Sequence, residues 1–135
     1  DLRALYAACG LAAPDWRKMP DDHLVFQLQF VARLLELAVC DDDWRSLADF
    51  LDYHLLRWLP DFSSRVAERC DTVFYGALVI LTNNWCQQLR DLIAQALNEA
   101  RPSREEIESE LRAQREAAPA PEPVHFLPGM HGPSW

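Results

Sequence analysis

Two short segments carry the side chains of this chain that could do chemistry. The first is Pro20-Asp21-Asp22-His23-Leu24, and the second, about thirty residues later, is His54-Leu55-Leu56-Arg57-Trp58-Leu59-Pro60-Asp61-Phe62. The first segment places carboxylates and an imidazole where a helix begins, and the backbone N–H groups there have no partner within the helix. Such side chains either cap the helix or bind a ligand. The aromatic corner around Pro60 suits core packing, and it equally suits a groove for an apolar peptide segment.

Catalytic and metal chemistry find little support in the sequence. None of the few serines lies in a glycine-flanked nucleophile elbow, and no cysteine is next to a histidine. The four glycines are scattered and cannot build a phosphate loop. Asp22 and His23 have no second pair of ligands at a useful spacing. We therefore expect a protein that is not an enzyme and that has no metal site.

The composition predicts an all-α fold. The chain has 135 residues, of which 50% are hydrophobic, with five Trp and only four Gly. Leu, Ala, Arg and Glu are plentiful while Ile and Thr are scarce, a balance that favours helix over strand. This length suits one domain with a single core. We expect a helical bundle of about five helices, then a solvated helix and an irregular C-terminal tail.

Apolar periodicity and helix breakers indicate where the helices lie. The patterns predict helices over 2–9, 24–39, 41–59, 61–69 and 73–97, and they divide the chain into a helical domain, 1–101, and a surface helix with a Pro-rich tail, 102–135. We expect Asp21 or Asp22 to cap the second helix, and Phe62 to face inward. The fifth helix is apolar nearly all round as far as Leu81, which predicts a central position in the bundle.

Charge and cysteine usage exclude some classes of protein. The net charge is −8, and both parts of the chain are acidic, so a nucleic-acid partner is not expected. The longest apolar stretch is too short to span a bilayer, so we expect no membrane insertion. Cys9, Cys40, Cys70 and Cys86 lie in or beside apolar helical patterns, and we expect buried free thiols, with two disulfides as the alternative. The chain is interpreted as cytoplasmic.

Three segments, taken in order, match a known pattern. Pro20-x-Asp22-His23-Leu24 resembles a Glu-Pro-x-Asp-His motif, Leu55-x-x-Trp58-x-Pro60-x-Phe62 resembles a segment ending in Trp-x-Pro-x-Phe, and Phe74-Tyr75-Gly76-Ala77-Leu78 resembles a Phe-Tyr-x-Ala-Leu helix opening. These are the motifs of the TorD/DmsD/NarJ family of redox-enzyme maturation chaperones. The resemblance covers roughly residues 1 to 97. Met19 stands where the family usually has Glu, and the family's N-terminal helical half has no counterpart here.

The resemblance implies the C-terminal part of an all-helical cytoplasmic chaperone. Such proteins bind the twin-arginine signal peptide of a molybdoenzyme precursor, and often the apo-enzyme body, and they assist cofactor insertion before export. The resemblance assigns leader binding to Pro20, Asp22 and His23. It also implies weak guanine-nucleotide (GTP) binding and a homodimer formed by exchange of helical halves.

A twin-arginine leader is a basic pair followed by an apolar stretch, so its receptor needs carboxylates beside an apolar groove. Asp21 and Asp22 could meet the guanidinium groups through charge-assisted hydrogen bonds. Leu55 and Trp58 could accept the apolar part.

Two other functions remain open on the sequence alone. The chain could be a helical scaffold or interaction module whose tail docks a partner. It could also be a nucleotide-dependent enzyme that uses Asp22 and His23 as base and ligand.

Overall fold

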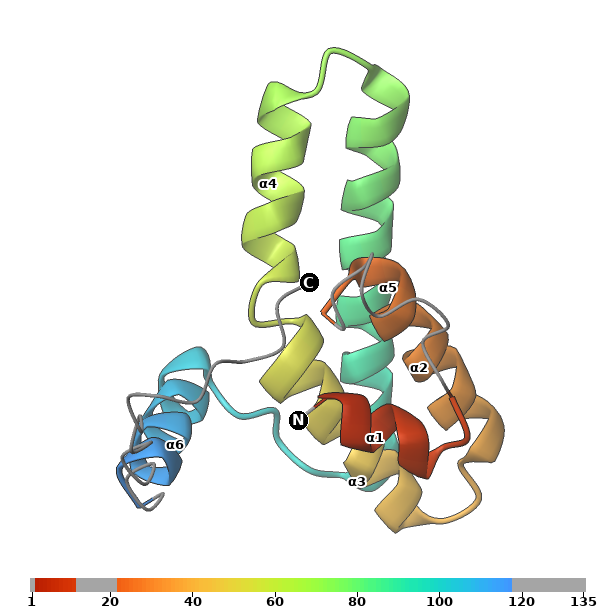
Figure 1. The fold of residues 1–135 in the computed structure, drawn as a ribbon, viewed down its shortest axis with the longest axis vertical. Helices are drawn as coiled ribbons and strands as arrows, with labels where there is room; N and C mark the ends of the chain where they lie inside the picture. Colours follow the sequence, from red (N-terminus) through yellow and green to blue (C-terminus); the bar gives the residue numbers. More distant parts are fainter. Residues whose placement is uncertain (1, 12–21, 118–135) are drawn as a thin grey trace, which may run out of the picture.

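The computed structural model describes residues 2–11 and 22–117 (Figure 1). Its elements, in chain order, are α1 (Leu2–Ala8), α2 (Leu24–Leu37), α3 (Asp41–Phe50), the π-helical η1 (Leu51–Leu55), α4 (Leu59–Arg69), α5 (Val73–Leu97) and α6 (Arg104–Ala117). This part of the chain contains helices and no strand, so the predicted all-α fold is confirmed. Pro20, Asp21 and the predicted tail, 118–135, lie outside the described residues.

The core lies where α1, α2, α3 and η1 meet α5. Its centre is a row of leucines four residues apart on α3, η1 and α4, all completely buried: Leu47, Leu51, Leu55 and Leu59. Aromatic rings extend the core towards α1, because Phe30 makes edge-to-face contacts with Tyr6 and Phe50 at centroid distances of 5.0 and 4.7 Å. Cys86 of α5 is fully buried in the same cluster. This core positions the faces of α2, η1 and α4 that carry the two motif segments.

The predicted helix over 41–59 is interrupted in the structure. Its first part, α3, passes into a π-helical turn in which the Leu56 N–H donates to the Leu51 carbonyl, five residues earlier, at 2.8 Å. A new helix, α4, then begins at Leu59 with Pro60 in its first turn. Proline has no N–H and clashes with the carbonyl four residues before it, so one continuous helix through Pro60 is excluded. The prediction of a regular helix up to Leu59 was therefore wrong.

Helices α4 and α5 pack side by side and extend away from the remaining helices as a hairpin (Figure 1). One face of α5 is buried and includes Val79, Cys86 and Ile93. The opposite face carries exposed apolar side chains at helical spacing: Phe74, Leu78, Leu81, Trp85 and Leu92. We call these five residues the α5 stripe. The predicted central position of this helix was wrong, because in the described residues nothing covers the α5 stripe.

Helix α6 is the predicted solvated helix. It begins with a reciprocal cap, in which the Ser103 N–H donates to Glu106 at 2.7 Å and the Glu106 N–H donates to the Ser103 hydroxyl at 3.2 Å. Ile107 is its one buried side chain, and Leu111 is half-buried. The helix therefore rests on the domain through a narrow apolar edge.

All four cysteines are free thiols, as expected. The expectation that they are buried was wrong for three of them, because only Cys86 is buried, while Cys9 and Cys70 are half-buried and Cys40 is exposed. Burial raises the pKa of the Cys86 thiol to about 11. Within the ranges that the structure describes, no helix combines the length and apolar character needed to cross a membrane.

Candidate functional site

The start of α2 is capped by a histidine rather than by an aspartate. The Val25 N–H donates to Nδ1 of His23 at 3.3 Å, while the Asp22 backbone carbonyl accepts from the Gln27 amide at 2.9 Å. The expectation that Asp22 caps this helix was therefore wrong. The Asp22 side chain is exposed and makes no hydrogen bond or ion pair with any residue that the structure describes. Its carboxylate is available to a ligand.

The structure brings the two motif segments together in one cleft. We call it the smaller cleft, because a larger one adjoins it. It has a volume of about 470 Å³, and its lining combines the start of α2 with η1, α4 and one residue of α1: Leu2, Asp22, His23, Leu24, Gln27, Tyr53, His54, Arg57, Trp58 and Phe62. Three of the residues predicted from the sequence, Asp22, His23 and Trp58, share this lining. Trp58 is more than thirty residues away from Asp22 and His23 in the chain.

The aromatic corner forms one wall of the smaller cleft. The rings of Trp58 and Phe62 lie edge to face with centroids 5.4 Å apart. Phe62 is 40% exposed and lines the cleft, so the expectation that it faces the core was wrong. Leu55 is fully buried in the core and does not line either cleft described here. Trp58 and Phe62 are thus the side chains of this segment that an apolar ligand would meet.

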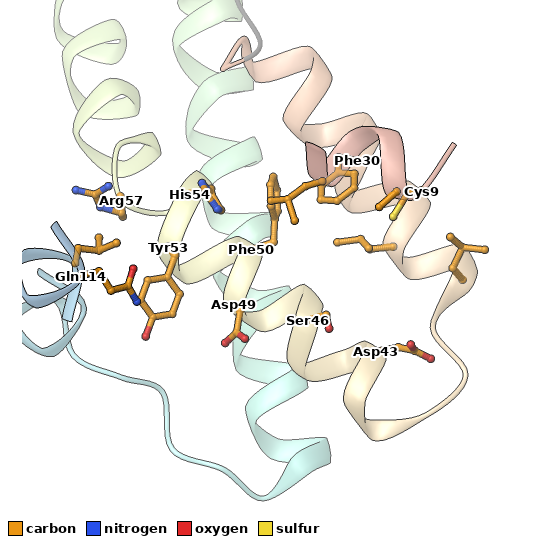
Figure 2. A pocket seen from close by; sticks show the side chains of 15 residues that line it. Cys9, Phe30, Asp43, Ser46, Asp49, Phe50, Tyr53, His54, Arg57 and Gln114 are labelled. Carbon is orange, nitrogen blue, oxygen red and sulfur yellow. The ribbon is translucent and has the colours of Figure 1, made fainter. Parts of the chain in front are cut away.

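A larger cleft of about 930 Å³ adjoins the smaller one (Figure 2). One end is apolar, with side chains from α1 and α2 that include Leu5, Phe30 and Leu34. The other end is polar, and Figure 2 shows Asp49, Tyr53, His54 and Arg57 along α3, η1 and the turn that follows. Tyr53, His54 and Arg57 line both clefts, so they form a shared rim.

The π-helical turn places this shared rim. Single π-turns inside helices are frequent at functional sites, because the extra residue changes where the following side chains point. Here Tyr53 and His54 belong to the turn, and Arg57 lies two residues after its end. Sequence reasoning gave Tyr53 no role and missed the larger cleft, whose lining comes from five elements. No residue type in this segment signals a π-turn.

Local contacts set the protonation states around the clefts. Partial burial lowers the pKa of His54, which favours the neutral imidazole. Burial, with the neighbouring Asp52 charge, raises the pKa of Asp49. The backbone N–H groups of Val39 and Cys40 donate to Asp43 and lower its pKa. The Tyr53 hydroxyl donates to Glu110 of α6, and this bond raises the tyrosine pKa to about 12.

The two clefts have the composition of a binding site. Apolar walls with a few placed polar groups are typical of pockets that hold an extended ligand. Among the described residues, no group of three His, Cys, Asp or Glu side chains could hold a metal ion. The geometry therefore supports binding of a ligand with a cationic and an apolar part.

Comparisons with known proteins show which proteins this all-α domain resembles. Residues 1–64 match the family described as nitrate reductase delta subunit. The chain is 29% identical over 110 residues to "Chaperone protein TorD" of Vibrio cholerae strain O395. The aligned region covers 73% of this chain and 48% of that protein. It is 34% identical over 83 residues to the protein of the same name from Shewanella oneidensis. Here the aligned region covers 58% of this chain and 36% of that protein. No solved structure matched the chain significantly.

These matches bear out the resemblance to the TorD/DmsD/NarJ family of redox-enzyme maturation chaperones that the three sequence motifs indicated. The matched relatives are named chaperones, which agrees with the expectation of a protein that is not an enzyme. The chain spans about half the length of the curated relatives that it matches.

Proposed function

We propose that this chain is the client-binding part of a molybdoenzyme maturation chaperone, and that the smaller cleft binds the twin-arginine signal peptide of the apo-enzyme. The observation that carries the proposal is the meeting of Asp22 and His23 with Trp58 and Phe62 in one cleft. The family resemblance supports the kind of partner. The resemblance also leads us to propose that binding takes place in the cytoplasm, before export, while the cofactor is inserted.

The proposed binding mode follows from the chemistry of the cleft. A guanidinium group of the leader would pair with the exposed Asp22 carboxylate, a charge-assisted contact that fixes orientation. The apolar residues that follow the arginines would pack on Trp58 and Phe62. Since exposed charge pairs are individually weak, most of the affinity would come from this apolar wall. Asp21 and Pro20, outside the described residues, remain proposed members of the site.

The apo-enzyme body and a second copy of the chain are further proposed partners. The α5 stripe supports the homodimer, because an apolar face of this length on a helix is normally covered by protein. Weak GTP binding remains part of the proposal through the family resemblance.

The test is a titration of the full chain with a fluorescent twin-arginine leader peptide, followed by anisotropy. Asp22→Asn should weaken binding about two- to fivefold, because an exposed charge pair contributes up to about 1 kcal/mol. Phe62→Ala should weaken it as well. Asp71→Asn, at an exposed turn residue far from Asp22 in the chain, makes the same change of charge and is the matched control. A leader with both arginines replaced by glutamine should bind the wild type and Asp22→Asn equally.

Equal affinity of the wild type and Asp22→Asn for the arginine leader would remove Asp22 from the site. Failure of the wild type to bind any leader would contradict the proposed function for this chain. Adding GTP to the same titration tests whether the nucleotide binds in competition with the peptide.

A further inference from the structure

Arg57 is out of place in a receptor for a basic peptide. Its side chain lines both clefts, and among the described lining residues it is the one permanently charged cation. An unpaired guanidinium at this rim would repel the arginines of a leader. In the smaller cleft it would also offset the Asp22 carboxylate, since the two charges are opposite. The cleft needs a further negative charge if it is to attract a cation.

Helix α6 supplies that charge. Nε and Nη2 of Arg57 donate to the same carboxylate oxygen of Glu108 at 3.2 and 3.0 Å. The two side chains are 32% and 46% exposed, so the pair lies at the surface, where its contribution to stability is small. The effect of the pair on the charge of the clefts is larger than its effect on stability, because Glu108 cancels the positive charge of Arg57, which lines both clefts.

The way in which α6 docks supports a role in the site. Glu110, half a turn further along, accepts the Tyr53 hydroxyl hydrogen bond, so two glutamates of α6 contact two residues of the shared rim. Arg104, at the start of the helix, pairs with Asp61 of α4 at 3.1 Å. Leu111 and Gln114 of α6 line the larger cleft, and Figure 2 shows Gln114 on the side where Tyr53 and Arg57 lie. The helix is thus one wall of the site as well as a source of charge.

We propose that Glu108 is a specificity-determining residue, which neutralises Arg57 and thereby makes both clefts selective for a cationic peptide. The identity of the ligand rests on the proposed function, whereas the effect on the charge of the clefts does not. Glu108 acts through Arg57 and is a positioning residue in this scheme. It gives α6, which has no motif of its own, a function in client recognition.

The experiment compares Glu108→Gln with Glu105→Gln, which makes the same change of charge on the first turn of the same helix, at a side chain that forms no hydrogen bond or ion pair with Arg57. Glu108→Gln should weaken binding of the arginine leader about three- to tenfold, the effect of one uncompensated charge near the surface. Glu105→Gln should change it less than twofold. The double variant Arg57→Gln/Glu108→Gln should regain most of the affinity. A leader with glutamines in place of the arginine pair should bind the wild type and Glu108→Gln equally.

Equal binding of the arginine leader by Glu108→Gln and Glu105→Gln would overturn the inference. Tighter binding by Glu108→Gln would overturn it too, because α6 would then compete with the peptide. Failure of the double variant to recover would show that Glu108 acts by a route other than Arg57.

A second arm separates this inference from the proposed function. The anionic apolar dye 1-anilinonaphthalene-8-sulfonate should bind Glu108→Gln more tightly than Glu105→Gln, and the double variant should lose this gain. If no leader binds the wild type, the proposed function fails, and the dye alone decides the inference. Equal dye affinities of Glu108→Gln and Glu105→Gln would then overturn it.

Discussion

Nε of Arg90 lies 2.8 Å from Oδ2 of Asp52, and both side chains are almost completely buried, with 6% and 4% of their surface exposed. The pair joins η1 to α5. Arg101, in the segment between α5 and α6, lies 3.9 Å from the other oxygen of Asp52. Because Asp52 directly precedes Tyr53 and His54, the pair holds the shared rim of the two clefts in place.

Removing the buried carboxylate should destabilise the fold strongly. Asp52→Ala leaves the Arg90 guanidinium buried without its partner, which typically costs about 3–5 kcal/mol of unfolding free energy. Urea unfolding followed by circular dichroism measures this. Asp42→Ala is the matched control, because it breaks an exposed pair with Arg45 and should cost less than about 1 kcal/mol. Equal losses of unfolding free energy in the two variants would show that the buried pair stabilises the fold no more than the exposed pair does.

His54 should make stability depend on pH. Partial burial lowers its pKa from the usual 6.5, so between the two pKa values the unfolded chain binds more protons than the folded one. Unfolding then takes up a proton, and stability falls as the pH drops below about 6.5. Urea midpoints measured from about pH 5 to 8 should show this decrease, and His54→Gln should lack that part of it. An identical pH profile in His54→Gln would contradict the prediction.

The fold class was accessible from the sequence because helix periodicity and breakers are local signals. Asp41-Asp42-Asp43 starts α3 within the predicted bounds, and Pro60 lies in the first turn of α4. The π-turn at Leu51–Leu55 was not predictable, since no residue type in this segment signals it. The exposure of α5 was missed for another reason. Hydrophobicity shows that both faces of a helix are apolar, but not whether both are covered.

The candidate site was predictable in part. The motifs selected Asp22, His23 and Trp58, and the structure places all three in one cleft. The prediction for Leu55 rested on its place in the motif, while its spacing of four from Leu51 and Leu59 indicates the core face on which it lies. The pairing of Arg57 with Glu108 spans 51 residues, and no local pattern indicates it.

The α5 stripe should mediate association between copies of the chain. Its side chains are widely exposed, with Leu81 at 65%, on the face of α5 opposite the one that packs into the domain. Removing such a surface from water gains roughly 25 cal/mol per Å² of apolar area, enough to drive dimerisation when two stripes meet. Sedimentation equilibrium of the full chain should therefore show a dimer, and Leu81→Glu should raise its dissociation constant at least about tenfold, because a carboxylate would be desolvated in the interface.

The matched control is Asn84→Glu, which adds the same charge on an exposed position of α5 outside the stripe. It should leave the dissociation constant within about threefold of the wild type, because a charge at the rim of an interface changes affinity little. Leu81→Glu should keep the urea midpoint of the monomer, since Leu81 contributes little to the core in the free chain. A wild type that sediments as a monomer at all concentrations, or a dimer that Leu81→Glu leaves intact, would show that the stripe does not bind a second copy.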